Sequence, residues 1–210
     1  MSHTDARSPS RVSDALSTLV IDVHTHIMPE SLPDMKARYG VGGWMTLEKM
    51  PCGKRARMMR DDGAAFREVE DSLWSQPRRL ADCNAKGVRA HVLSTVPVLF
   101  SYWAPDEAAD DFARELNDHM ARSVAVAPNR FVGLGTLPMQ NPRLAVQELR
   151  RCMGPLGLAG VQIGTHVNDK PLSDPEFFPI FEAAAELGAS IFVHPCELFS
   201  LLYFQIFLFT

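Results

Sequence analysis

Residues 19–26 are Leu-Val-Ile-Asp-Val-His-Thr-His, an apolar run that ends in two histidines. A short, continuously apolar stretch rich in Val and Ile predicts a parallel strand that is covered on both faces. Residues two apart in a strand point to the same side, with Cα atoms roughly 6.5 Å apart, so His24 and His26 could bind one metal ion. A lone His-x-His is a short pattern, and two ordinary hydrogen-bonded histidines remain an alternative at this point.

Four more apolar runs follow, separated by longer helical patterns, and they too predict strands that are covered on both faces. They are residues 88–93, 131–137, 160–163 and 190–193. Alternating strands and helices are typical of βα units around a parallel sheet. No Gly-x-Gly-x-x-Gly follows the first strand, which favours a (β/α)8 barrel over a doubly wound sheet. A complete barrel needs roughly 250 residues. The sequence therefore predicts an α/β fold of TIM-barrel type that is incomplete, with about five of the eight βα units.

Capping residues predict where the helices begin and end. Asn141 followed by Pro142 predicts the start of one helix, and Asp174 followed by Pro175, with Gly188 beyond the last turn, brackets another. Pro105 opens a long acidic helix that is expected to reach about residue 127.

The chain divides into three parts. Residues 1–18 are polar and predict a flexible extension, and residues 19–195 predict the partial barrel, with an insertion at about 27–75 after the first strand. Residues 196–210 form an uncharged apolar tail that is shorter than the ~20 residues of a membrane-spanning helix. We expect this tail to be a read-through or mis-spliced terminus, with a tail anchor or a buried strand as weaker alternatives.

Composition excludes several classes of protein. Of the 210 residues, 46% are hydrophobic and 22% charged, which is typical of a globular protein, and the net charge of -4 provides no basic surface for nucleic acid. The four cysteines are too far apart for a C-x-x-C site or a small disulfide framework. We expect a cytosolic protein without a membrane or nucleic-acid partner.

A third histidine strengthens the metal hypothesis. His194 closes the apolar run Ser-Ile-Phe-Val-His, so it lies at the carboxyl end of the fifth predicted strand, where barrel active sites form. Three neutral imidazoles suit a single Zn2+ ion and leave a position for water. The fourth predicted strand contains no lysine, so a bridged pair of metal ions is not implied.

Longer motifs make the sequence resemble a known family. They are Ile-Asp-Val-His-Thr-His-Ile-Met-Pro (21–29), Gly-Gly-Trp (42–44), Leu-Ser-Thr-Val-Pro (93–97), Phe-Ser-Tyr-Trp (100–103), Arg-Phe-Val-Gly-Leu-Gly-Thr-Leu-Pro-Met-Gln (130–140) and Gly-Val-Gln-Ile-Gly-Thr-His-Val-Asn (160–168). Together they resemble the aminocarboxymuconate-semialdehyde decarboxylases of the amidohydrolase superfamily. This resemblance implies a carboxy-lyase with one zinc ion that forms a homodimer. Its substrate would be aminocarboxymuconate semialdehyde, in the kynurenine pathway of tryptophan breakdown, at the branch toward quinolinate and NAD.

The resemblance also implies roles for individual residues. His24, His26 and His194 match the metal-binding histidines of the family, and Arg67 matches an arginine that binds a substrate carboxylate, for which a planar guanidinium is suited. By itself, Arg67 would be taken for a surface arginine. The catalytic histidine of the family belongs beyond residue 195, where the family's His-Pro-Trp-Asp is replaced by His-Pro-Cys-Glu. We therefore expect no catalytic residue within the chain, which would be inactive alone.

Two other functions remain open. A His-x-His barrel could also be a metal-dependent hydrolase that activates water against amides or esters. Alternatively, the chain could be a truncated, non-catalytic isoform that pairs with a full-length enzyme.

Overall fold

The computed structural model describes residues 20–196, so the predicted extension at 1–18 and the tail beyond Cys196 lie outside the described residues. Five strands form one parallel sheet in the order β1-β5-β6-β7-β10. They are β1 (Val20–Ile27), β5 (Val88–Thr95), β6 (Phe131–Gly135), β7 (Gly160–Gly164) and β10 (Ser190–His194). The prediction of five βα-type strands of an incomplete barrel is confirmed.

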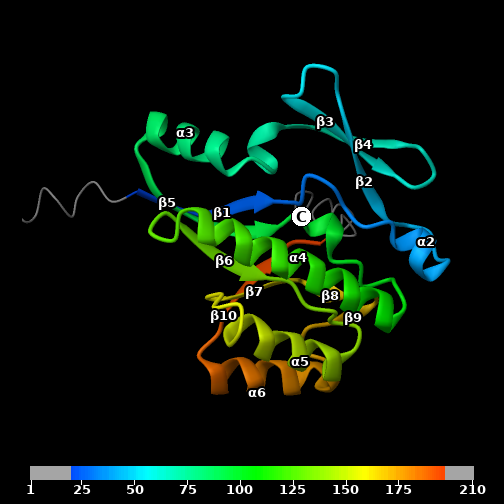
Figure 1. The fold of residues 1–210 in the computed structure, drawn as a ribbon. Helices are drawn as coiled ribbons and strands as arrows, with labels where there is room; N and C mark the ends of the chain where they lie inside the picture. Colours follow the sequence, from blue (N-terminus) through cyan, green and yellow to red (C-terminus); the bar gives the residue numbers. More distant parts are fainter. Residues whose placement is uncertain (1–19, 197–210) are drawn as a thin grey trace, which may run out of the picture.

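Four helices follow one another around the outside of this sheet (Figure 1). They are α3 (Gln76–Lys86), α4 (Asp106–Val126), α5 (Pro142–Met153) and α6 (Phe178–Leu187). Shorter elements lie in the connections: α2 (Met35–Tyr39), η1 (Asp71–Leu73), η2 (Pro97–Leu99), η3 (Pro175–Phe177), β8 (His166–Val167) and β9 (Lys170–Pro171). No helix in the described part of the chain has the length and hydropathy of a membrane span.

Caps confirm the predicted start of α5 and end of α6, whereas Asp174 and Pro175 begin the 3-10 helix η3 and α6 itself begins at Phe178. The side chain of Asn141 accepts a hydrogen bond from the Leu144 N–H at 3.1 Å, and Pro142 occupies the first turn of α5. Gly188 ends α6 with a φ of 63°, a left-handed conformation that favours glycine.

Close packing of the helices depends on small residues in β6. A Cβ atom on Gly135 would lie 2.6 Å from Cys152 Sγ and 3.0 Å from Asn117 Oδ1, so a larger residue would push α4 and α5 away from the sheet. Asn117 fixes the end of this strand, because it accepts from the N–H of Thr136 at 2.7 Å and donates to the carbonyl of Thr136 at 2.8 Å.

The two outer strands of the sheet are more exposed than the sequence predicts. Every residue of β7 is buried, as its apolar pattern indicates. In contrast, Val20, Ile21 and Val23 on β1 and Val193 on β10 are 45–56% exposed. The prediction that all five strands are covered on both faces is therefore wrong for β1 and β10. Among residues 20–196, no strand pairs with the outer edge of either one.

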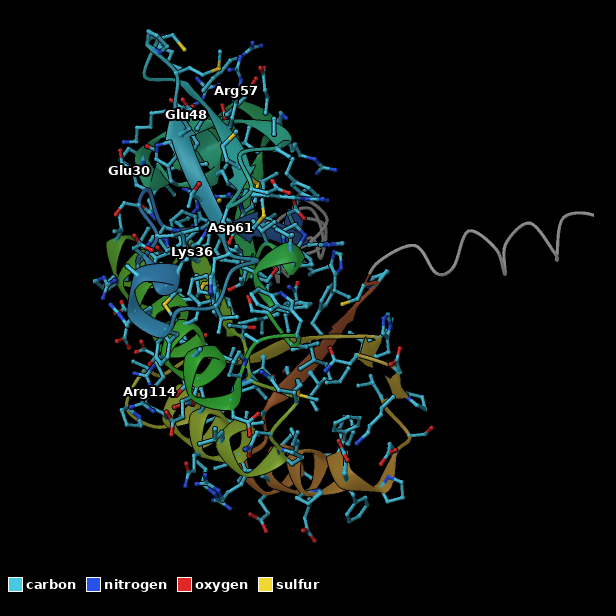
Figure 2. The ribbon with its side chains drawn as sticks, turned by 90° about the vertical axis from the view of Figure 1, so that its right-hand side faces the viewer. Glu30, Lys36, Glu48, Arg57, Asp61 and Arg114 are labelled. Atoms are coloured by element: carbon cyan, nitrogen blue, oxygen red, sulfur yellow. The ribbon has the colours of Figure 1, made fainter. Side chains whose placement is uncertain are left out.

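The predicted insertion contains a separate antiparallel sheet of three strands, β2 (Met45–Lys49), β3 (Arg55–Arg60) and β4 (Ala65–Glu70). Charged residues alternate across it: Arg57 pairs in register with both Glu48 and Glu68, and its Nε donates to Glu68 at 3.3 Å. Figure 2 shows Arg57 and Glu48 on this sheet, and Lys36 near Asp61 below them, with 3.9 Å between the charged atoms.

A buried carboxylate joins α4 to α5. The Glu148 side chain is fully buried and accepts hydrogen bonds from Arg151 Nε and Nη2, both at 2.8 Å. It also accepts from Asn117 at 2.7 Å and from Arg114 at 3.3 Å, whose position is labelled in Figure 2. A buried carboxylate is stable only when it is paired and hydrogen-bonded in this way.

We predict that Arg151→Ala lowers the free energy of unfolding by about 3 kcal/mol, because the buried Glu148 carboxylate then loses its hydrogen bonds from the Arg151 guanidinium. Arg150→Ala is the matched control, since Arg150 lies one residue away and pairs with Glu186 in solvent, where both side chains are more than half exposed. Arg150→Ala should lower the free energy of unfolding by less than about 1 kcal/mol. Urea unfolding followed by circular dichroism measures both, and equal losses would contradict a special role for the buried pair.

Candidate metal centre

The end of β1 aims two histidines into the interior of the curved sheet. The pairing of β1 with β5 shifts between Asp22 and Thr25, as in a β-bulge, and the N–H of His24 donates to Asp22 Oδ1 at 3.1 Å. Beyond the shift, His26 pairs in register with Ser94 of β5. The rings of His24 and His26 lie with their centroids 5.0 Å apart.

His194, the last residue of β10, meets both rings. Its ring centroid is 4.9 Å from that of His24 and 5.1 Å from that of His26, and Phe192 of the same strand lies 5.2 Å from His24. Since β1 and β10 are at opposite ends of the sheet, these contacts cross its interior. The sheet is thus an arc whose concave side holds the three imidazoles that the sequence predicts as metal ligands.

The distances fit a metal ion. One nitrogen of each ring lies within 4.8 Å of the others, and the Nε2 atoms of His24 and His26 are 3.2 Å apart. Two nitrogens bound at about 2.0 to 2.1 Å to one tetrahedral ion lie roughly 3.3 Å apart. In the described part of the chain, these three residues form the group of His, Cys, Asp or Glu side chains whose possible ligand atoms all lie within 4.8 Å of one another.

The surroundings of two of the rings also favour metal binding. Burial, followed by the neighbouring His194 and His24, lowers the pKa of His26 to about 4, so its ring is neutral at physiological pH. The Nδ1 atom of His194 is 2.7 Å from the carbonyl oxygen of Pro195. Because a carbonyl only accepts, Nδ1 carries the proton and Nε2 is free to bind a metal.

Two residues that support this centre are missed by the sequence analysis. The buried guanidinium of Arg79 donates to the carbonyls of His26 at 2.6 Å and Ser72 at 2.8 Å, which ties β1 to η1. The hydroxyl of Ser94 contacts the ring of His26. Ser94 lies in the motif at 93–97 but nothing in that motif gives it a role, and Arg79 occupies an ordinary helix position, so the tertiary packing identifies both.

The candidate residue Arg67 and a further histidine, His166, lie outside the cluster. Arg67 is exposed on β4, and its guanidinium is 6.0 Å from the ring of Phe66. The assignment of Arg67 to a substrate carboxylate stays a prediction. His166 lies on β8, where its Nδ1 contacts the hydroxyl of Thr165 at 3.2 Å.

Comparison with known proteins assigns the family. A family model described as amidohydrolase matches residues 21–208. The chain belongs to the amidohydrolase family. The arc of parallel strands described above agrees with the barrel that the sequence resemblance implies.

The amidohydrolase chain is similar to several decarboxylases. It is 50% identical to a 2-amino-3-carboxymuconate-6-semialdehyde decarboxylase of Dictyostelium discoideum, over 86% of this chain and 50% of that protein. It is 33% identical to a protein of the same name from Caenorhabditis elegans, over 85% of this chain and 49% of that protein. The resemblance that the motifs indicate is therefore confirmed, and the chain spans about half the length of these relatives.

A solved structure shares the fold. It is a 5-carboxyvanillate decarboxylase from Novosphingobium aromaticivorans with bound manganese, 32% identical, with a TM-score of 0.56 over 60% of this chain and 36% of that one.

We predict that the purified chain binds one Zn2+ or Mn2+ ion and that His194→Ala weakens this binding by at least about 100-fold, more than the loss of a residue that only supports a ligand. His166→Ala is the control, because it removes an imidazole of a neighbouring segment that is not in the cluster. Metal analysis after equilibrium dialysis measures both variants. Equal retention by wild type and His194→Ala would contradict the assignment.

Proposed function

We propose that this chain carries the metal-binding part of a non-oxidative decarboxylase, a carboxy-lyase that acts on aminocarboxymuconate semialdehyde. The observation that carries this proposal is the convergence of His24, His26 and His194 inside the arc of strands. The 50% identity to a decarboxylase of that substrate supports the choice of reaction.

We further propose that the ion is zinc. Three imidazole nitrogens and no sulfur form a set that Zn2+ binds well, although manganese is present in a related structure. A divalent ion held there would act as a Lewis acid toward the substrate or a water molecule. The three rings fix its position, and the neutral state of His26 allows binding without displacing a proton from that ring.

Arg67 would bind a carboxylate of the substrate. It lies on β4 with its guanidinium exposed, and a planar fork of N–H groups matches two carboxylate oxygens. The neighbouring Arg57 differs, because Glu68 already accepts a hydrogen bond from it. Arg57 therefore provides a matched control for the loss of a positive charge from the same sheet.

We propose that the chain alone is almost inactive and retains only a residual turnover. Its family resemblance assigns proton transfer to a histidine beyond residue 195, and a general acid or base typically contributes 10²- to 10⁴-fold to the rate. The wider proposal places the reaction in the cytosol, in tryptophan breakdown by the kynurenine pathway, at the branch toward quinolinate and NAD. It includes a homodimer in which a neighbouring subunit's arginine completes the substrate site.

Two alternatives make different predictions. A metal-dependent hydrolase would use the same three histidines against an amide or ester. A non-catalytic isoform would bind a longer chain through the backbone at the outer edges of β1 and β10, which pair with no other strand among residues 20–196.

The test is CO2 release from aminocarboxymuconate semialdehyde by the zinc-loaded chain, measured by mass spectrometry. We expect metal-dependent release that is about 10² to 10⁴ times slower than the usual enzyme range of 1–10³ s⁻¹. Hydrolysis of amides or esters without CO2 would contradict the proposal and favour the hydrolase. Turnover within the usual range would contradict the expectation of low activity.

Variants control the experiment. His194→Ala should abolish CO2 release, and Arg67→Ala should raise KM by roughly 10-fold or more, the effect of losing a hydrogen bond to a charged group. Arg57→Ala should leave KM unchanged. A wild-type chain that releases no more CO2 than His194→Ala would favour the non-catalytic isoform.

A further inference from the structure

A serine of β5 contacts the metal-binding end of β1. Ser94 is only 2% exposed, and its Oγ lies 3.0 Å from the carbonyl oxygen of Thr25 and 3.1 Å from Nδ1 of His26. Ser94 and His26 pair in register, so both side chains lie on the same side of the sheet. The contact is therefore set by the strand pairing itself.

The position of one proton follows from these two contacts. A serine hydroxyl has a single proton to donate, and the carbonyl of Thr25 only accepts. Both contacts are hydrogen bonds together only when the hydroxyl donates to Thr25 and accepts from a protonated Nδ1 of His26. A neutral imidazole carries one proton, so Nε2 of His26 then has a free lone pair.

We propose that Ser94 is a positioning residue that holds His26 in the tautomer with the proton on Nδ1 and thereby presents Nε2 to the metal. This proposal rests on the metal-binding function proposed above and adds a residue to it. Nε2 of His26 faces Nε2 of His24 at 3.2 Å, on the side where the cluster converges. With the other tautomer, an N–H would occupy that space and exclude the ion.

Two of the three rings, those of His194 and His26, have different partners at Nδ1. His194 donates to the carbonyl of its own neighbour, Pro195, which needs no other strand. His26 has a side-chain partner on β5, Ser94, beside a backbone hydrogen bond with Thr95, so the contribution of the side chain can be tested by a single substitution. Partners that orient a metal-binding histidine typically change metal affinity by 10- to 100-fold when removed.

The tautomer is tested first in the metal-free wild-type chain, at a pH where imidazoles are neutral. Nitrogen-15 NMR of labelled histidine distinguishes a protonated from an unprotonated ring nitrogen, and the spectrum of His26→Gln identifies the signals of His26. We expect the proton on Nδ1. A proton on Nε2 overturns the proposal, and because no metal or substrate is present, that result is independent of whether the chain decarboxylates anything.

The second test compares Ser94→Ala with Thr25→Val. Thr25 Oγ1 donates to the carbonyl of Val92 at 3.0 Å, so Thr25→Val also removes a side-chain hydrogen bond between β1 and β5 but touches no imidazole. We expect Ser94→Ala to shift the His26 proton toward Nε2 and to weaken Zn2+ and Mn2+ binding by about 10- to 100-fold. Thr25→Val should keep both the tautomer and the affinity.

Two outcomes contradict the proposal. An unchanged tautomer in Ser94→Ala would show that another group holds the proton on Nδ1. An equal loss of metal affinity in both variants would show that Ser94 acts only by joining the two strands. Circular dichroism of each variant verifies that the chain remains folded.

Discussion

The structure depends on one contact across the concave side of the sheet, where His194 of β10 meets His24 and His26 of β1. These strands are the two ends of a five-stranded parallel sheet and share no backbone hydrogen bond. Only the curvature of the whole arc brings their rings within 5 Å or so of each other. Any residue that sets the spacing of the intervening strands therefore contributes to the site.

Support for the centre comes from the outside of the arc as well as the inside. Arg79 of α3 holds the carbonyl of His26, and Asn117 of α4 holds both backbone groups of Thr136 at the end of β6. Glu148 then joins Asn117 to α5. Side chains of the helices thus hydrogen-bond the backbone at the strand ends, and such directional buried contacts fix the position of the backbone.

Much of this arrangement could be predicted from the sequence because local patterns determine it. Apolar runs predicted the five strands, Asn141 and Gly188 predicted helix ends, and strand-terminal histidines predicted the cluster. The exposure of β1 was not predictable, since apolar composition does not say whether a neighbour is present. The antiparallel sheet of the insertion was missed because its strands, Arg-Ala-Arg-Met-Met-Arg and Ala-Phe-Arg-Glu-Val-Glu, mix charged and apolar residues and contain no continuous apolar run. Ser94 and Arg79 depend on pairings between distant segments.

X-ray absorption spectroscopy of the zinc-loaded chain tests the central claim most directly. The account predicts three imidazole nitrogens at about 2.0 to 2.1 Å from the ion. It also predicts that His194→Ala reduces this number to two. A spectrum with two imidazoles in the wild type, unchanged by His194→Ala, would show that β10 does not contribute to the site and would contradict the account.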